Sequence, residues 1–326
     1  MKEKILTCLK KGKGFVSGQA ICEELGVSRT AVWKYIRALK QEGYEIESVT
    51  RKGYRLLQSP DLITEETIRN GMPKGLYPGG IYAFSSIDST NEEARRAAAG
   101  GVAAPALFAA DRQTAGKGRR GRTWISPGGE DIFFSILLRP EIEPDQASML
   151  TIIAALSGAA AIEKHGGIPC RIKWPNDLLL HDRKVCGILT EMAVEMDEIS
   201  YVIVGAGFNL NRMFFDEDIA DMASSVLKET GRRVDRTDFL SDFSVEFMDR
   251  YRIFLDQGSL APFLTEYNRR LVNTGRRVKV VRRGQEIIRT AGGINEGGEL
   301  IVFDDDGKKE TILSGEVSVR GLYGYV

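Results

Sequence analysis

A helix–turn–helix pattern followed by a basic hairpin is the feature that most restricts how the N-terminus can fold. Ser17 can cap one helix and Ser28 the next, and Gly26 stands between them, where a left-handed residue commonly ends a helix. The two helices repeat apolar residues at the spacing that buries one face, namely Ala20, Ile21, Leu25, Val32, Ile36 and Leu39. The sequence therefore predicts two packed helices joined by a tight turn.

The exposed face of the second of these helices is basic. Residues 44–49 and 54–57 can then pair as strands across Arg51-Lys52-Gly53, which completes a winged helix-turn-helix. Residues 1–58 hold 12 Lys and Arg against six Asp and Glu, a net charge of +6 in a chain whose overall charge is zero. A small helical interaction domain is the alternative interpretation. We predict DNA binding through Ser28, Arg29, Thr30, Trp33, Lys34, Arg37, Arg51 and Lys52.

The pattern changes twice more along the chain. Strand-like segments and helices alternate in the middle, with strands at 82–84, 106–110, 132–138, 171–174, 185–191 and 201–207 and helices near 90–99, 146–165 and 235–257. Short β-rich runs separated by glycine pairs then follow. We predict an α+β protein with a winged helix at 1–58, a linker at 59–64, a mixed α/β domain at 65–270 and a small β-barrel-like domain at 271–326.

Simple counts exclude some classes of protein. No apolar run approaches the roughly 18 residues of a membrane span, and residues 1–13 lack a secretory pattern, so we expect a cytoplasmic protein without a membrane partner. The four cysteines have no metal-ligand spacing, so we predict reduced thiols and no protein metal site.

Gly116–Trp124 is the most unusual stretch of the chain. It reads GKGRRGRTW, with four cations and three glycines in nine residues. Such a loop repels itself unless an anion compensates the charge, and phosphate or carboxylate is the natural candidate. It is not a Walker A loop, because glycine follows Lys117 where Ser or Thr is required. A solvated basic loop that touches RNA is the alternative.

Several further motifs carry polar groups near the ends of predicted strands. In KWPND, Pro175 breaks a strand, so that Asn176 and Asp177 are presented on a loop. In KVCGILTE, a glycine at the fourth position of a strand indicates close approach by a ligand or by another part of the chain. At STNEE, Thr90 and Glu93 predict a capping box at the start of a helix.

In this order, the segments STN, GKGRRGRTW, KWPND, KVCGILTE and GAGFNLN resemble the biotin–protein ligase family. With the winged helix in front, the chain is similar to the bifunctional repressor-ligase subclass over essentially all 326 residues. The resemblance implies a central domain of the class II synthetase/biotin–lipoate ligase fold and a C-terminal SH3-like barrel. One departure is Lys117, which stands where the family usually has arginine and loses the bidentate fork. The contact that Lys117 makes is therefore open.

The resemblance also implies roles for individual residues. Biotin contacts are expected from Ser89, Thr90, Asn91, Gln113, Lys117, Gly118, Arg119, Lys184 and Gly187. Contacts to ATP and the adenylate are expected from Arg119, Arg120, Arg122, Trp124, Asn176 and Asn209. Catalytic roles are expected from Lys184, Arg119, Lys117 and Asp177.

The activity that the resemblance implies has two half-reactions. Biotin and ATP give biotinyl-5′-AMP, with Mg²⁺ held through the ATP phosphates, and a lysine of a biotin carboxyl carrier domain then accepts biotin. The expected partners are this carrier, operator DNA and a second copy of the chain in a homodimer promoted by the adenylate. The alternatives are a regulator that has lost catalysis, a ligase whose winged helix is only a support, and a lipoate ligase.

Overall fold

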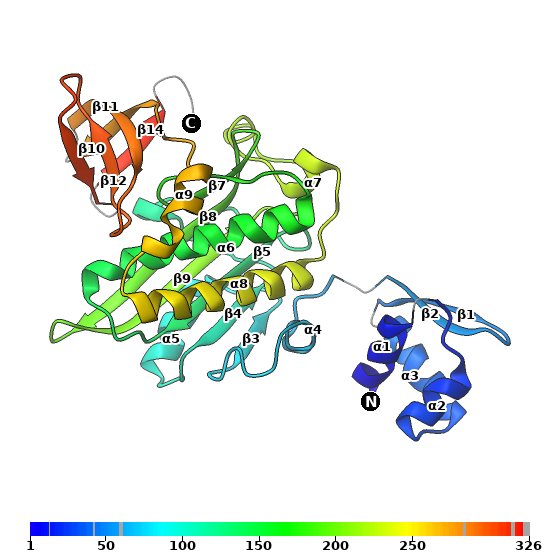
Figure 1. The fold of residues 1–326 in the computed structure, drawn as a ribbon. Coiled ribbons are helices and arrows are strands. Elements are labelled where there is room, and N and C mark those ends of the chain that lie inside the picture. The colour runs from blue at the N-terminus through cyan, green and yellow to red at the C-terminus, as the bar shows by residue number, and fades with distance from the viewer. Residues whose placement is uncertain (13, 42, 59–60, 283–284, 314–316, 322–326) are drawn as a thin grey trace. The chain divides into compact units, whose positions relative to one another are not determined.

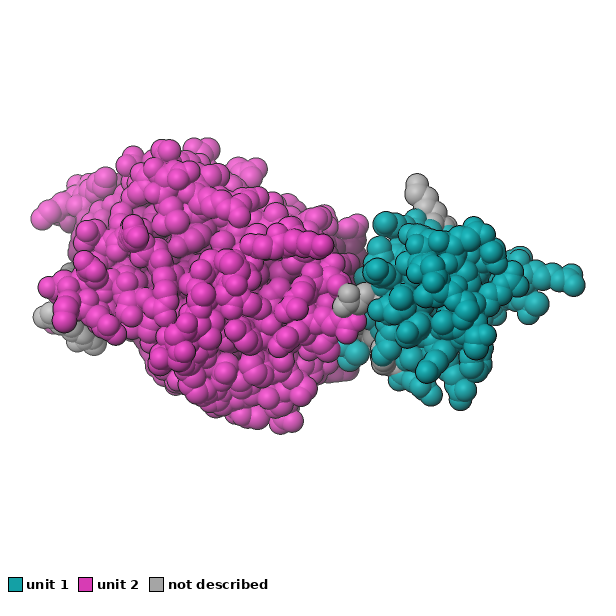
Figure 2. All heavy atoms as spheres, turned by 90° about the horizontal axis from the view of Figure 1, so that it is seen from below, with its two compact units in different colours: residues 1–62 teal, residues 63–326 magenta. Residues whose placement is uncertain are grey.

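The computed structural model describes residues 1–12, 14–41, 43–58, 61–282, 285–313 and 317–321 (Figure 1). The chain divides into two compact units, Met1–Leu62 and Ile63–Val326, which Figure 2 colours separately. The division falls inside the linker predicted at 59–64, of which residues 59 and 60 lie outside the described residues. The boundaries within the second unit stay predictions.

The N-terminal unit contains three helices and a two-stranded hairpin. The helices are α1 (Lys2–Lys11), α2 (Gly18–Leu25) and α3 (Arg29–Gln41), and the strands are β1 (Glu45–Val49) and β2 (Gly53–Gln58). The expected caps are confirmed: the Ser17 and Ser28 hydroxyls accept backbone bonds of 3.0 and 3.2 Å, and Gly26 has φ of 64°. The helix-turn-helix predicted from the sequence is therefore the fold of this unit.

The core of this unit follows the apolar spacing of its helices. One face of α3 is buried, with Val32, Ile36 and Leu39 each no more than 3% exposed. These side chains pack in one cluster with Ile5, Leu9 and Ile21 of the other two helices. Because this apolar face is buried in the core, the basic residues of α3 lie on the opposite, exposed face.

A seven-stranded sheet organises the second unit. Its order is β3-β4-β5-β9-β8-β7-β6, in which β3 and β4 are parallel and all other neighbours antiparallel. The strands are β3 (Ile81–Phe84), β4 (Ala106–Ala110), β5 (Ile132–Leu138), β6 (Arg171–Lys173), β7 (Asp177–Leu180), β8 (Arg183–Glu195) and β9 (Glu198–Phe208). The mixed sheet agrees with the α+β class predicted from the sequence.

Helices cover both faces of this sheet (Figure 1). They are α4 (Glu65–Gly71), α5 (Thr90–Ala99), α6 (Met149–Gly166), α7 (Val226–Thr230), α8 (Arg236–Gln257) and α9 (Leu264–Arg270), with short 3₁₀ turns η1 (Arg119–Gly121), η2 (Pro144–Ser148) and η3 (Ala261–Phe263). Alternate residues of the strands separate the two faces. Phe108 and Ile203 pack with Ala94 and Ala98 of α5, whereas the residues beside them belong to the larger cluster with α6 and α8.

Helix α6 is buried on almost every side. Together with η2 it forms the only stretch among the described residues that is long and apolar enough to cross a membrane. The absence of such a stretch, expected from the sequence, is therefore corrected. In this structure 72% of the stretch is buried inside the protein, which is typical of a core helix that contacts both the sheet and α8.

The C-terminal part of the second unit is a five-stranded antiparallel sheet of order β13-β12-β11-β10-β14. Its strands are β10 (Arg277–Arg282), β11 (Gln285–Ile294), β12 (Leu300–Phe303), β13 (Lys309–Ile312) and β14 (Val317–Gly321). Trp174, at the end of β6, joins this part to the central sheet. Its indole Nε1 donates to the Gly298 carbonyl at 3.0 Å, and its backbone N–H donates to Asn273 Oδ1 at 2.9 Å.

The shorter elements α4, α7, α9 and β7 were not predicted from the sequence. Strand β7 matters most, because Asp177 was expected on a loop. The chain reverses so tightly after β6 that Asp177 pairs with Lys173 as the first residue of the next strand. Of the two residues expected on the loop, Asn176 does lie in the turn between the strands, together with Trp174 and Pro175.

We predict that Gly53→Ala opens the hairpin of the N-terminal unit. Gly53 has φ of 110°, and a Cβ there would lie 2.1 Å from the Val16 carbonyl oxygen. Such strain costs roughly 1–3 kcal/mol, so the amides of residues 45–58 should exchange their hydrogens faster. Gly14→Ala is the control, because nothing lies within 4 Å of a Cβ at that position. Equal exchange in the two variants would contradict the prediction.

Candidate active site

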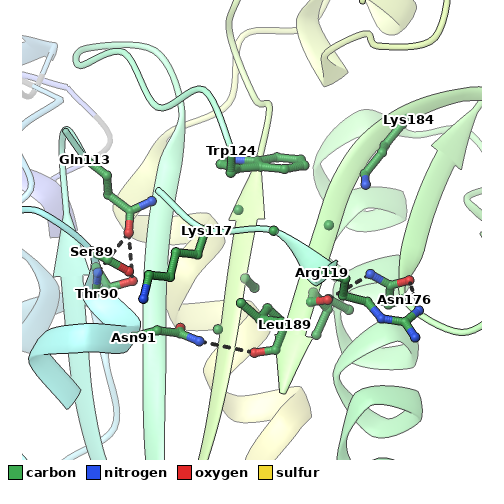
Figure 3. Close-up of a pocket in the computed structure, with 16 residues that line it drawn as sticks. Ser89, Thr90, Asn91, Gln113, Lys117, Arg119, Trp124, Asn176, Lys184 and Leu189 are labelled. Atoms are coloured by element: carbon green, nitrogen blue, oxygen red, sulfur yellow. Dashed lines mark hydrogen bonds between the residues drawn. The ribbon is translucent and has the colours of Figure 1, made fainter. Parts of the chain in front are cut away.

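A pocket at one end of the central sheet collects residues from most of the motifs (Figure 3). It lies over β8 and β9, between the start of α5 and the turn after β6. The basic loop, which we define as residues 116–124, crosses it. The pocket is lined by Ser89, Thr90, Asn91, Gln113, Lys117, Gly118, Arg119, Trp124, Asn176, Lys184, Gly187, Ile188, Leu189, Gly205, Ala206 and Gly207.

The polar end of the pocket is a fixed hydrogen-bond network at the start of α5. Gln113 Oε1 accepts from the Thr90 backbone N–H at 2.8 Å and from the Thr90 hydroxyl at 3.2 Å, and Gln113 Nε2 donates to Ser126 Oγ at 3.0 Å. The buried Ser135 hydroxyl lies 2.8 Å from Thr90 Oγ1 and 2.6 Å from Asn91 Oδ1. Side chains held in this way present polar groups in one geometry, as recognition of a small polar ring requires.

The capping box predicted for Thr90 and Glu93 is wrong. Thr90 is the first residue of the helix, and Ser89 is the N-cap without a side-chain cap bond. The Thr90 hydroxyl contacts Gln113 instead, and Glu93 pairs with Arg96 at 2.7 Å. A tertiary partner thus replaces the local one, which leaves the Ser89 hydroxyl at the pocket without a capping role.

The basic loop is closed on itself by backbone bonds and tied to the protein by two of its cations. The Gly118 N–H donates to the Arg122 carbonyl at 2.7 Å, and Lys117 pairs with Thr123. The Lys117 amine contacts Glu92, and Arg119 donates to Asn176 Oδ1 at 3.0 Å. Burial lowers the pKa of the Arg119 guanidinium, although the carboxylate of Asp177 acts in the opposite direction. A partly desolvated guanidinium of this kind binds an anion strongly.

Trp124 closes the basic loop by lying against bare backbone. Its indole packs on Gly187 and Gly207, which face each other across β8 and β9. A Cβ on Gly207 would lie 2.4 Å from the indole Nε1, and one on Gly187 would lie 2.8 Å from Cζ3. The buried Nε1 has no hydrogen-bond partner in the part of the chain that the structure describes. A buried donor without an acceptor costs about 1–3 kcal/mol, so we expect the ring to shift when a ligand offers one.

Lys184 brings a charged amine to the same place. Its Nζ lies 5.0 Å from the centroid of the Trp124 ring and 2.6 Å from Asp177 Oδ1. Both side chains of the ion pair are largely buried, with 23% and 15% exposure. The contact with the Asp177 carboxylate holds the amine in one position at the pocket, where it can attract a negatively charged group.

Three residues predicted to bind ATP lie outside this pocket. Arg120 and Arg122 are exposed on the outer turn of the basic loop, where Arg120 has φ of 58°. Asn209 is buried below the pocket, with its amide donating to the Ser224 carbonyl at 3.0 Å. Asp177 does not line the pocket either, but it reaches it through Lys184. The roles expected of these residues stay predictions.

Sequence reasoning missed a buried ion pair next to the site. Arg212 lies 2.6 Å from Asp131, which is fully buried, and it also donates to the Ile125 carbonyl at 3.1 Å. Burial raises the pKa of Asp131, and the Arg212 guanidinium opposes this shift. A lone Arg after a strand and a lone Asp before another carry no motif, so only the fold could join them.

No group of three or more His, Cys, Asp and Glu side chains that could hold a metal ion occurs within the described ranges. The carboxylate of Asp177, which contacts Lys184, offers oxygen atoms that could serve as metal ligands. A single carboxylate in this position fits a magnesium ion that takes most of its ligands from phosphate and water.

The residues predicted to bind DNA lie on the surface of the N-terminal unit. Those on α3 and its N-cap, and those at the tip of the hairpin, are all exposed. Trp33 is 54% exposed, and the Arg37 guanidinium stacks 5.5 Å from the centroid of its ring. An exposed basic and aromatic face on the second helix of the motif is the surface that enters a DNA groove.

Fold and site together define a ligase of the biotin/lipoate type. Residues 83–209 match the biotin/lipoate A/B protein ligase family, residues 2–55 an HTH domain, and residues 274–320 the biotin protein ligase C-terminal domain.

Full-length relatives extend this match. The bifunctional ligase/repressor BirA of Bacillus spizizenii is 36% identical over 94% of this chain and 95% of its own length. That of Escherichia coli is 31% identical over 97% of this chain and 96% of its own. The biotin protein ligase of Aquifex aeolicus, solved with biotin and ATP, is similar with a TM-score of 0.65 and 31% identity, covering 74% of this chain and 98% of that one. The chain belongs to the family of bifunctional biotin–protein ligases and repressors.

We predict that Gly207→Ala displaces Trp124. The added methyl group would overlap the indole, and overpacking of this kind costs roughly 1–3 kcal/mol. The chain has three tryptophans, so 5-fluorotryptophan labelling gives three ¹⁹F resonances. The Trp124 resonance should shift, while those of Trp33 and Trp174 serve as internal controls. An unchanged Trp124 resonance would mean that the ring does not rest on the glycine pair.

Proposed function

We propose that the chain is an ATP-dependent biotin–protein ligase that also represses transcription in response to biotin. Its substrates are biotin, ATP and a lysine of a biotin carboxyl carrier domain, as in acetyl-CoA carboxylase. The observation that carries the proposal is the pocket itself, in which a rigid polar end, a basic loop and a half-buried lysine lie side by side. We expect this activity in the cytoplasm, where ATP and operator DNA are available.

The first half-reaction joins two anions and needs positive charge where they meet. A biotin carboxylate oxygen attacks the α-phosphorus of ATP, which forms biotinyl-5′-AMP and breaks the bond to pyrophosphate. Ser89, Thr90 and Gln113 suit the polar ureido ring of biotin, because they offer hydroxyl, amide and backbone groups held in place. Lys184 and Arg119 would then neutralise the charge shared by carboxylate and phosphate.

The second half-reaction needs the adenylate to survive until the acceptor arrives. The acceptor amine attacks the acyl carbon, forms an amide, loses a proton and expels AMP. Hydrolysis of the mixed anhydride competes with this transfer, so exclusion of water is valuable. The basic loop lies across the pocket and would shield the adenylate, with Lys117, Gly118 and Arg119 nearest to it.

Mg²⁺ would accompany ATP and supply charge neutralisation at the phosphates. Asp177 is the residue that we expect to orient it or its water ligands, and the ATP phosphates would provide the main ligands. Trp124 and Asn176, which line the pocket, are the proposed neighbours of the nucleotide, whereas Arg120, Arg122 and Asn209 do not line it.

The N-terminal unit gives the second activity. One winged helix makes few phosphate contacts and binds DNA weakly, with strong dependence on salt. Specific repressors of this type bind as dimers to two half-sites at a fixed spacing. We therefore infer a homodimer whose formation the adenylate favours. Linkage then requires that dimerisation tighten adenylate binding by the same factor.

Lys184→Ala should strongly impair adenylate formation. Removing one preorganised charge-stabilising group costs roughly 3–4 kcal/mol of transition-state stabilisation, and pyrophosphate release measures the loss. Arg183→Ala is the matched control, because Arg183 is the next residue along the chain, is 46% exposed and pairs only loosely with Glu229 at 3.6 Å. Near-normal pyrophosphate release by folded Lys184→Ala would refute this role.

Biotin supply should be visible in DNA binding. We expect operator affinity to rise with biotin plus ATP, and to fall again when unmodified carrier domain is added, since the carrier discharges the adenylate. Band-shift and sedimentation measurements under the three conditions test this, with non-operator DNA of equal length as the control. Equal operator affinity in all three conditions would contradict the repressor function in the proposal and leave the ligase function untouched.

Mass spectrometry of the carrier tests the ligase activity alone, and it distinguishes attached biotin from attached lipoate.

A further inference from the structure

The side chain of Lys117 forms an ion pair with another residue of the same chain. Figure 3 shows it running from the basic loop toward the end of the pocket formed by Ser89, Thr90 and Asn91. Its amine contacts Glu92 on the first turn of α5. The hydrogen bond from Lys117 lowers the pKa of Glu92, which burial alone would raise. The carboxylate is therefore ionised at neutral pH and can hold the Lys117 amine.

Glu92 also belongs to a longer row of charges. Arg95 donates to both oxygens of Glu92 at 2.7 Å, and it contacts Glu191 of β8 at 2.9 Å. The second oxygen of Glu191 accepts from the Asn91 amide at 2.7 Å. Two cations and two anions alternate, so the row is neutral. It joins the basic loop, helix α5 and strand β8, which are far apart in the sequence.

The basic loop thus has two side-chain anchors at opposite ends of the pocket. Arg119 reaches Asn176 on one side at 3.0 Å, and Lys117 reaches Glu92 on the other. Figure 3 shows the two side chains directed away from each other, with the loop between them. The Arg119 guanidinium donates to the amide oxygen of Asn176, and a phosphate would be a stronger acceptor because it is charged. The Lys117 amine already has a carboxylate.

We propose that Glu92 is a positioning residue of the adenylation site. Through Lys117 it holds the basic loop across the pocket, and the closed loop retains the adenylate until the acceptor lysine arrives. This inference rests on the proposed ligase function. In this proposal the Lys117 side chain closes the loop. The backbone around Gly118 and the Arg119 guanidinium contact the ligand. Loss of Glu92 would also leave Lys117 and Arg95 close together without their shared anion, so the two cations would repel each other.

The test measures how long the adenylate stays on the full-length protein. Biotinyl-5′-AMP is formed on the enzyme from labelled biotin and ATP, and its release is followed after a chase with unlabelled biotin and ATP. Glu92→Gln should release it about three- to tenfold faster, the scale of a partly exposed ion pair that belongs to a network. Serum albumin added as a bystander should acquire more biotin. Release from the wild type should accelerate with NaCl, and release from Glu92→Gln should respond less.

Glu93→Gln is the matched control. Glu93 is the next residue on α5, but it pairs with Arg96 and not with the loop. Its variant should release adenylate at the wild-type rate. Glu92→Asp keeps the charge on a shorter side chain and should restore part of the retention. Thermal midpoints of all variants show whether a change in release reflects loss of the fold.

A double-mutant cycle isolates the pair. Lys117→Gln should speed release as Glu92→Gln does, and the double variant should add little to either, because both changes remove the same contact. Additive effects would overturn the direct pairing. Wild-type release by Glu92→Gln, or equally fast release by Glu93→Gln, would overturn the positioning role. If the wild type makes no adenylate at all, the proposed function fails instead, and the two failures are distinguishable.

Discussion

The site is built around the contact between an indole ring and two glycines. Trp124 can lie flat on the sheet only because Gly187 and Gly207 face each other and neither has a side chain. The ring fixes the end of the basic loop, and the Lys184 amine lies 5.0 Å from its centroid. Strand interiors rarely favour glycine, since it packs poorly and loses much conformational entropy. Here the loss of packing between strands is replaced by packing against the tryptophan.

The second constraint is charge. Four cations in nine residues repel one another in a short loop. In the structure two of them contact acceptor groups of the protein itself. Lys117 has the carboxylate of Glu92, and Arg119 has the amide oxygen of Asn176. Arg120 and Arg122 lie exposed, where water screens them. The loop is thus held on one side by the contact between Lys117 and Glu92 and on the other by Arg119, which donates to Asn176 and also feels the carboxylate of Asp177.

The N-terminal unit follows a simpler rule. The apolar face of α3 is buried in the small core of this unit, so its exposed polar face is available to a partner. The hydrophobic core of the unit is a cluster separate from that of the ligase part. In our proposal the ligand contacts residues of the second unit alone, so we expect biotin to act on DNA binding through the proposed homodimer.

The sequence by itself determined the winged helix, the α+β class, the main strands and the motifs that the pocket gathers. These rest on local signals: a cap at Ser17, a left-handed Gly26, alternating apolar residues and unusual loops. Only the tertiary structure decided that Thr90 bonds Gln113 and not Glu93, that Asp177 starts a strand beside Lys184, and that Glu92 holds Lys117. In each case the partner is distant in sequence or carries no motif. Local patterns set the backbone, but the choice of partner for a charged or polar side chain is made by whichever group the completed fold brings within reach.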